Sequence, residues 1–255
     1  MKQAGEKFAC LTAYDAMFAQ VLEAAGVEVL LVGDSLGMVI QGHDSTLPVT
    51  TNDIIYHAQA VSRGSSRALI MADMTFMSYS SEQQAVENAG RMLKEAGAHI
   101  VKLEGGAAFI PVVEKLTDFG IPVCCHLGLL PQTVNKMGGY KIQGKDQESA
   151  ERILQDARAL EKAGCDIMLL ECVPMELAKK VTEALEVPVI GIGAGPYCDG
   201  QVLVLQDMLG ITPGKRPRFT QDFLADTGSV AAAVEAYVNA VKTGVFPSPE
   251  QSFTS

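Results

Sequence analysis

The stretch VLLVGDSLG, Val29 to Gly37, decides how the rest of the chain is interpreted. It opens with an apolar run without polar alternation, which is typical of a strand covered on both faces in a parallel sheet. The run stops at Gly33, and Asp34 and Ser35 follow directly. The sequence therefore predicts a buried parallel strand with an acidic residue at its carboxyl end.

The same arrangement recurs along the chain. Five further apolar runs end near an acid, a histidine or a glycine: ALIMAD (68–73), HIVKLEG (99–105), PVCCHLG (122–128), DIMLLEC (166–172) and PVIGIGAG (188–195). Polar residues gathered at one end of successive parallel strands build the active site of a (β/α)8 barrel. With strands also expected at 8–13 and 201–206, we predict an α/β protein, a single (β/α)8 TIM barrel domain over residues 1–255.

The connections between these strands refine the expectation. Helical patterns occupy most of the gaps, but between Gly195 and Gln201 there is room for only a turn. The segment 129–146 is too long for a simple connector, so it is a candidate lid or binding loop. The pattern from 220 onward looks helical, with a C-terminal helix at about 229–243, and a loose tail is expected over 246–255.

A doubly wound sheet is the alternative architecture. It usually carries its chemistry at one switch point, often with a glycine-rich phosphate turn. GIGAG at 191–195 follows a late strand and has no long helix or ribose-binding acid after it. Acids at the ends of several strands favour the closed barrel instead.

Composition limits the partners and the compartment. The net charge of −10 argues against a nucleic-acid or anionic-membrane surface. We find no signal peptide and no run of the ~18 apolar residues that a membrane helix needs. The six cysteines are scattered, without a CxxC pair, and mostly lie in apolar runs. We expect buried free thiols in a reducing cytoplasm.

Asp34 and Asp73 each follow an apolar run, so in a barrel they meet at the same mouth. Two carboxylates there, with Glu104 nearby, suit a hard divalent ion such as Mg2+ that keeps open positions for a substrate. The alternative is that each aspartate caps the helix that follows it. The pair taken together favours the metal.

Lys102 and Glu104 lie two apart on a strand and therefore point to the same face, whereas Leu103 faces the helices. Burying both charges is expensive unless they are paired or used. An internal salt bridge is the simpler alternative. A substrate carboxylate would give Lys102 a further partner, and a metal would give Glu104 one.

Glu171, His126 and Ser35 are further candidates. The leucines before Glu171 disfavour its charged form, which suits a general base, although an acid near Pro174 can also serve the next helix dipole. His126 could be a ligand, a proton donor or an ordinary hydrogen-bonded histidine. Ser35 could cap a helix or donate to a bound anion.

Longer motifs match one family. The chain resembles ketopantoate hydroxymethyltransferase in TAYDA (12–16), LLVGDSLGM (30–38), QGHDSTLPVT (41–50), VKLEGG (101–106), HLGLLPQ (126–132), GGYKIQG (138–144), LLECVP (169–174), IGIGAG (190–195) and DGQVLV (199–204). These matches follow in order over nearly the whole chain. One departure is Thr75, which stands where the family usually has a proline.

The resemblance implies a magnesium-dependent enzyme of pantothenate biosynthesis. Such an enzyme transfers a one-carbon unit from 5,10-methylenetetrahydrofolate to 3-methyl-2-oxobutanoate, giving 2-dehydropantoate. It implies substrate binding by Asp34, Ser35, Asp73 and Lys102, metal binding by Asp34, Asp73 and Glu104, and proton abstraction by Glu171. His126 stays a possible secondary residue. The family commonly forms homodecamers, so a homo-oligomer is expected.

Two other functions remain open on the sequence. One is a barrel lyase or mutase that acts on another 2-oxo acid through the same metal-enolate chemistry. The other is a catalytically silent barrel kept for assembly or metabolite sensing, against which the intact acids Asp34, Asp73, Glu104 and Glu171 speak.

Overall fold

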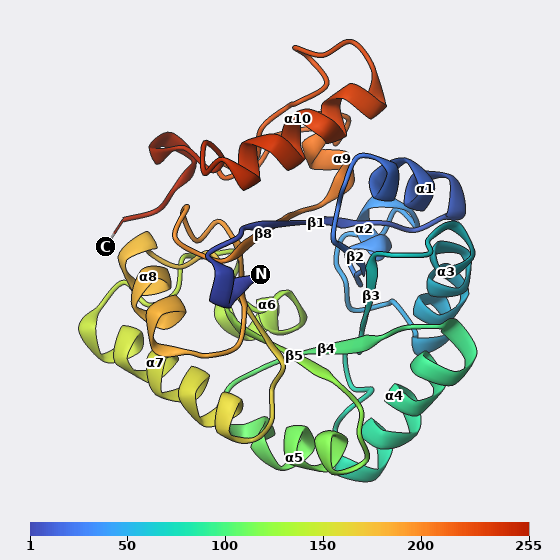
Figure 1. Ribbon diagram of the computed structural model, residues 1–255. Coiled ribbons are helices and arrows are strands. Elements are labelled where there is room, and N and C mark those ends of the chain that lie inside the picture. Colours follow the sequence, from blue (N-terminus) through green and yellow to red (C-terminus); the bar gives the residue numbers. More distant parts are fainter. Residues whose placement is uncertain (255) are drawn as a thin grey trace.

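The computed structural model describes residues 1–254, and its strands close into a parallel barrel in the order β1 to β8 (Figure 1). The strands are β1 (Phe8–Thr12), β2 (Val29–Val32), β3 (Leu69–Asp73), β4 (Ile100–Glu104), β5 (Val123–Gly128), β6 (Ile167–Glu171), β7 (Val189–Ile192) and β8 (Gly200–Leu203). Neighbouring strands pair in parallel, and β8 pairs with β1. The predicted (β/α)8 barrel is confirmed.

Most of the helices form an outer ring around this barrel, and a few short ones lie over its end (Figure 1). They are α1 (Ala16–Ala24), α2 (Leu36–Val39), α3 (Thr51–Gly64), α4 (Glu82–Ala96), α5 (Ile110–Asp118), α6 (Val134–Met137), α7 (Gln147–Lys162), α8 (Met175–Ala184), α9 (Leu205–Met208) and α10 (Val230–Lys242). Short 3-10 turns are η1 (Lys2–Ala4), η2 (Ala107–Phe109), η3 (Pro131–Thr133) and η4 (Pro249–Gln251). Within residues 1–254, no helix is both long and apolar enough to cross a membrane.

Side chains alternate between the inside of the barrel and the layer under the helices. On β5, Cys124 belongs to the apolar cluster inside the barrel, whereas Cys125 packs in the larger cluster between the strands and the helices. Leu103 of β4 also lies in that outer cluster, as expected for a residue between two inward-facing ones. All the cysteines are buried and free. This alternation places Lys102, Glu104 and His126 inside the barrel.

The β7–β8 corner departs from the regular pattern. Within residues 1–254 only turns connect the two strands, as the short spacing predicted. The rings of Phe219 and Phe253 fill the space beside Gly193, where an added Cβ would lie 2.9 and 3.2 Å from them. The Met175 N–H also donates to the Phe253 carbonyl at 2.8 Å. The C-terminal segment therefore finishes the barrel wall where a helix is missing.

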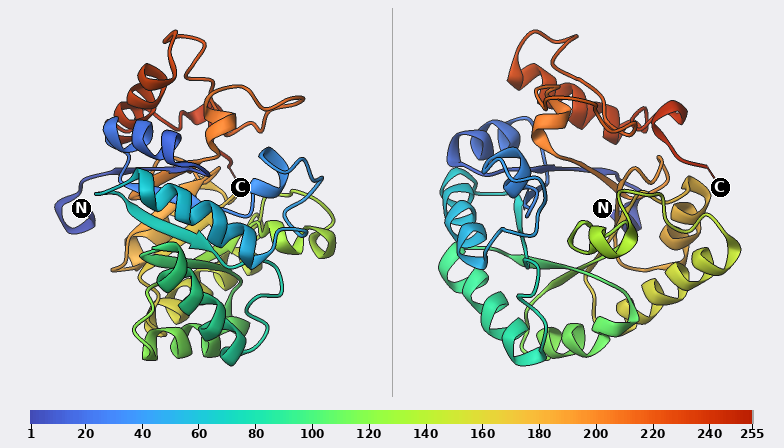
Figure 2. Two further views of the ribbon diagram at one scale, coloured as in Figure 1. Left: turned by 90° about the vertical axis from the view of Figure 1, so that its right-hand side faces the viewer. Right: turned by 180° about the vertical axis from the view of Figure 1, so that it is seen from behind.

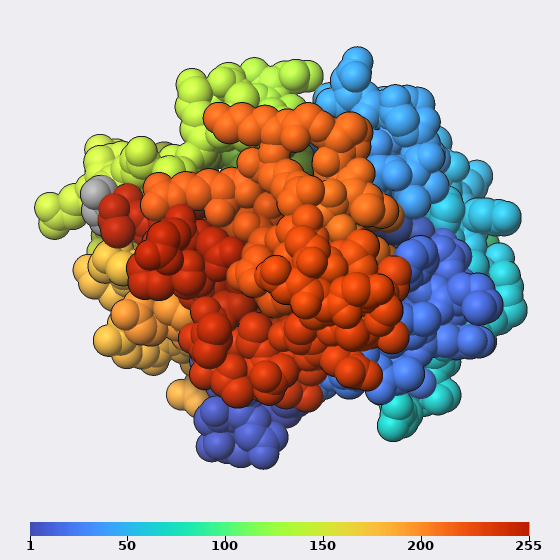
Figure 3. All heavy atoms as spheres, turned by 90° about the horizontal axis from the view of Figure 1, so that it is seen from above, coloured from blue at the N-terminus to red at the C-terminus, as the bar shows by residue number. Residues whose placement is uncertain are grey.

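The C-terminal region differs from the sequence-based expectation in two places. Residues 220–229 form turns rather than helix, and α10 begins only after Ser229, whose side chain accepts from the Ala232 N–H. The tail expected to be loose is packed in part: Phe246 and Ser252 are buried, whereas Glu250 and Thr254 are exposed. Its prolines and serines hid this packing, because they interrupt any apolar period. Figure 3 shows that the segments following β8 cover this side of the barrel.

Candidate active site

The predicted site residues gather at the carboxyl ends of β2 to β6. Strand register brings them side by side, because Asp73 pairs with Lys102 on the next strand and Glu104 pairs with His126 on the one after. Each of these four is at most 4% exposed. Parallel strands thus produce a continuous row of charged groups across the mouth of the barrel.

Asp73 links two strand ends. One carboxylate oxygen, Oδ1, contacts Lys102 Nζ at 2.5 Å, and the other accepts a hydrogen bond from the Asp34 N–H at 2.9 Å. The internal ion pair considered for Lys102 therefore exists, and its partner is Asp73 rather than Glu104. A lysine and an aspartate that are both buried are stable only as such a pair.

His126 lies between two carboxylates. Its Nδ1 is 3.6 Å from Glu104 Oε1, and its Nε2 is 3.3 Å from Glu171 Oε2. At these distances charge, rather than well-formed hydrogen bonds, holds the ring in place. Glu171 is the most accessible of the three, with 15% of its side chain exposed. It is therefore the carboxylate most open to a molecule entering the mouth.

The charged groups of the site shift one another's pKa values. Burial raises the pKa of Asp34, and the nearby Asp73 and Glu104 carboxylates raise it further. Burial lowers the pKa of Lys102, but Asp73, Glu104 and Asp34 outweigh it, so the lysine pKa lies above its usual value. In the same way burial opposes the charged form of His126, while Glu104 and Glu171 raise its pKa to about 9. The site as a whole therefore attracts cations.

The side chains of Asp73, Ser35 and Glu171 do not cap the helices that follow them. Ser81 caps α4 by accepting from the Gln84 N–H, and Asp73 bonds across the barrel instead. Ser35 stands at the start of α2 without a side-chain cap bond, and its hydroxyl lies 2.8 Å from the Tyr14 hydroxyl. Glu171 faces His126, and α8 begins at Met175, after Pro174 as its N-cap, without a side-chain cap bond.

A magnesium ion requires oxygen ligands, which carboxylates at the mouth of the barrel could supply. Over residues 1–254, no group of three or more His, Cys, Asp or Glu side chains is arranged to hold a metal. Asp34 and Asp73 are nevertheless adjacent, and Lys102 is the one lysine among the carboxylates Asp34, Asp73 and Glu104. Mg2+ is usually held by one or two carboxylates, with water and substrate completing the shell. This donor set and its excess of negative charge fit such an ion.

The backbone next to Glu171 is tightly constrained. Cys172, the following residue, has a φ of 47°, which is uncommon for a residue other than glycine. Gly128 on the neighbouring strand has a φ of 94°, and a Cβ there would lie 2.2 Å from the Glu171 carbonyl oxygen. The Leu129 N–H donates to that same carbonyl at 2.8 Å. These contacts fix the point from which the Glu171 side chain projects.

The long segment 129–146 stands at the mouth. It contains η3 and α6, and α6 projects from the same end of the barrel as α2, opposite the N-terminus (Figure 2, left). The Tyr140 hydroxyl is 3.9 Å from Met38 Sδ at the end of α2. Burial and the charges of Glu171, Asp34 and Glu104 raise the pKa of Tyr140.

Sequence analysis missed three polar residues of the site: Tyr14, Tyr79 and Gln132. All three are buried, and each bonds to a predicted residue or to its strand. Only Gln132 carried a signal, since it lies near the start of the long segment that follows β5. A tyrosine in an apolar stretch does not reveal from the sequence whether its hydroxyl faces a site.

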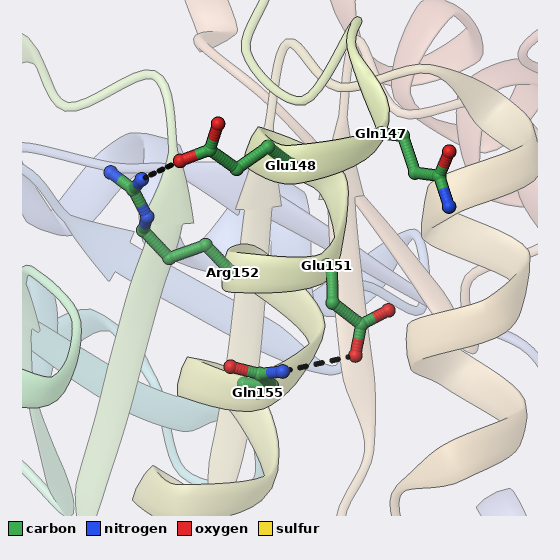
Figure 4. A pocket seen from close by; sticks show the side chains of 5 residues that line it. All are labelled: Gln147, Glu148, Glu151, Arg152 and Gln155. Atoms are coloured by element: carbon green, nitrogen blue, oxygen red, sulfur yellow. Dashed lines mark hydrogen bonds and ion pairs between the residues drawn. The ribbon is translucent and has the colours of Figure 1, made fainter.

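A separate hollow on the outside of the barrel has no such chemistry. It lies along α7 and is lined by Gln147, Glu148, Glu151, Arg152 and Gln155 (Figure 4). Arg152 pairs with Glu148 at 3.1 Å, and Gln155 donates to Glu151 at 3.1 Å. Such bonds between residues four apart are ordinary on an exposed helix surface.

Known proteins resemble this chain over nearly its whole length. The model of the family described as ketopantoate hydroxymethyltransferase matches residues 1–249. The chain belongs to this family. A 3-methyl-2-oxobutanoate hydroxymethyltransferase from Nitrosococcus oceani is 59% identical over 99% of the chain and 96% of its own length. A second, from Hahella chejuensis, is 57% identical with the same coverage. This member of the ketopantoate hydroxymethyltransferase family is thus an enzyme of the transferase class.

Solved structures agree with the fold. The crystal structure of a phosphonopyruvate hydrolase in complex with oxalate and Mg++ superposes on this chain with a TM-score of 0.60. It covers 79% of this chain and 77% of its own, at 13% identity. A likeness at that identity shows that this family member shares the barrel architecture.

Proposed function

We propose that this chain transfers a hydroxymethyl group from 5,10-methylenetetrahydrofolate to 3-methyl-2-oxobutanoate, forming 2-dehydropantoate in pantothenate biosynthesis. The observation that carries the proposal is the row of charged residues at the mouth of the barrel: Asp34, Asp73, Lys102, Glu104 and His126 are buried, and Glu171 is partly exposed. The names of the close relatives support the choice of keto acid.

The keto acid needs a cationic and hydrogen-bonding receptor, which the chain supplies. Lys102 and the Asp34–Ser35 turn would bind its carboxylate and keto group, with Asp73 holding Lys102 in place. Asp34 and Asp73, with Glu104, are the side chains that would hold Mg2+. When bound, that ion would polarise the keto oxygen and make the adjacent C–H more acidic.

Glu171 is the proposed proton acceptor. Its carboxylate takes the proton from C3 of the keto acid, and the electron pair of that C–H bond passes into the enolate. The enolate carbon then forms a C–C bond to the methylene group carried by the folate as one C–N bond of that bridge breaks, and the freed nitrogen takes up the proton held by Glu171. Water adds its hydroxyl to the same carbon as the second C–N bond breaks and gives its other hydrogen to that nitrogen, which releases the hydroxymethyl product and tetrahydrofolate. His126, whose Nε2 lies 3.3 Å from Glu171 Oε2, orients the Glu171 carboxylate before the transfer.

Solvent deuterium exchange at C3 tests this role. We expect the wild-type chain with Mg2+ to exchange the C3 hydrogen of 3-methyl-2-oxobutanoate, measured by NMR. Glu171→Gln should slow exchange by about 100-fold, the usual range for loss of a general base, and leave keto-acid binding largely intact. Glu176→Gln, on the exposed start of α8, is the matched control and should exchange normally. Full exchange in Glu171→Gln would remove Glu171 from the mechanism.

The folate requirement separates this function from a lyase or mutase on another 2-oxo acid. Omitting 5,10-methylenetetrahydrofolate should abolish product formation while exchange at C3 continues. Turnover of a 2-oxo acid without any folate would favour the lyase or mutase.

We further propose a cytoplasmic homo-oligomer, a decamer in line with the family resemblance. Sedimentation equilibrium of the purified chain tests the assembly.

A further inference from the structure

Gln132 lies at the centre of the site without being part of the proposed reaction. It belongs to η3, directly after β5, and its side chain is buried with the residue only 4% exposed. A buried amide carries two donors and an acceptor that must all find partners. The partners of Gln132 come from the ends of three strands.

The amide nitrogen donates to two acceptors. Nε2 lies 2.9 Å from Asp34 Oδ2 and 2.9 Å from the Met74 carbonyl oxygen. Because a main-chain carbonyl can only accept, the contact to Met74 fixes which end of the amide is nitrogen. The hydrogen bond to Asp34 is therefore one in which Gln132 donates.

The amide oxygen and the main chain complete the connection. Oε1 accepts from the Tyr79 hydroxyl at 2.6 Å, and that hydroxyl accepts from the Glu104 N–H at 3.3 Å. The Gln132 N–H donates to Glu104 Oε2 at 3.0 Å. One residue thus engages one oxygen of Asp34 and one of Glu104.

These hydrogen bonds determine which oxygen of each carboxylate is left for a ligand. With Oδ2 of Asp34 engaged, its other oxygen Oδ1 is the one left for a ligand. With Oε2 of Glu104 engaged, Oε1 is the oxygen that faces His126. A neutral amide does this without adding charge to a site that already holds several carboxylates, whereas a glutamate here would repel Asp34.

We propose that Gln132 is a positioning residue that orients the Asp34 and Glu104 carboxylates for the keto acid. The inference rests on the proposed function, because that function places Asp34 and Glu104 on the substrate and its ion. Because Gln132 lies in η3, near the start of the segment 129–146, it ties the base of that segment to the catalytic strands.

Two substitutions of Gln132 separate the effect of its hydrogen bonds from the effect of its side-chain size. Gln132→Glu keeps the shape and replaces the donor with an oxygen, and Gln132→Met keeps the length and removes both kinds of hydrogen bond. Gln20→Glu makes the same chemical change on the exposed surface of α1, away from the site, and is the matched control. We expect kcat/KM for hydroxymethyl transfer to fall about 10- to 100-fold in both Gln132 variants, as for other residues that orient ligands. The control should match wild type.

Calorimetric titration of 3-methyl-2-oxobutanoate in MgCl2, without folate, gives a second readout. Lost orientation should raise the Kd of the keto acid about tenfold or more in every remaining site. A purely structural role would lower Tm and the number of binding sites but leave that Kd unchanged. Gln132→Met serves if Gln132→Glu does not fold.

The outcomes are distinct. If the wild-type chain is active and both Gln132 variants keep kcat/KM and Kd within twofold of its values, the role of Gln132 is overturned and the proposed function is not. A wild-type chain that neither binds nor converts the keto acid overturns the proposed function and this inference with it.

Discussion

Replacing Lys102 by methionine removes the cation that faces Asp73, while keeping a side chain of similar length. Only 5% of the lysine side chain and 3% of the aspartate side chain are exposed, so water cannot replace the lost partner. Removing one member of such a buried pair destabilises a protein by about 3 to 5 kcal/mol. For a chain of this size, 1 kcal/mol shifts Tm by about 2 °C, so we expect a fall of about 6 to 10 °C.

A double-mutant cycle identifies the cause. In Lys102→Met with Asp73→Asn, the uncompensated carboxylate is gone, and part of the lost stability should return. Lys179→Met is the matched control, because Lys179 pairs with Glu183 at 3.8 Å on an exposed surface. That change should alter stability by less than about 0.5 kcal/mol.

Thermal unfolding followed by circular dichroism is the assay, since the chain has no tryptophan. Chain concentration must be equal across variants, because assembly would shift Tm. A Tm for Lys102→Met as close to wild type as that of the control would refute the buried-pair argument. So would a double variant no more stable than the single one.

Three further outcomes are expected. Burial opposes the charge of Glu23, but hydrogen bonds from Ser65 and the 66–68 main chain hold its pKa well below the usual value. The stability that this carboxylate contributes is therefore fully present above about pH 4.3 and is lost as the pH falls below it. Acid titration followed by circular dichroism should show that Glu23→Gln lacks this loss. Gly128→Ala, which drives a Cβ toward the Glu171 carbonyl, should slow C3 exchange about 100-fold by NMR. The six buried thiols should resist a thiol reagent in the native chain and all react in denaturant.

Much of the site was accessible from the sequence because strand ends are easy to recognise. An apolar run followed by Asp34, or one containing Lys102 and Glu104, fixes both the end of the barrel and the face of the strand. The alternation at Leu103 needed no other information. These local patterns were enough to predict the fold and the positions of the candidate residues.

Partners across strands could not be predicted in the same way. Lys102 contacts Asp73 because β3 and β4 are paired in one particular register, and that stagger depends on the whole barrel closing. Gln132 reaches Asp34 only through the path of η3, which leaves no periodic trace. Phe246 and Phe253 lie in a proline- and serine-rich tail whose packing depends on distant surfaces.

Because Phe253 completes the β7–β8 corner, the barrel can be completed only late in the synthesis of the chain. The ribosome makes β1 first, yet β1 pairs with β8, and the ring of Phe253 leaves the exit tunnel later still. Until then the nascent chain carries an unpaired strand edge, which is prone to wrong pairing. The strand ends that hold the acids therefore reach their final geometry only after β8 has left the exit tunnel.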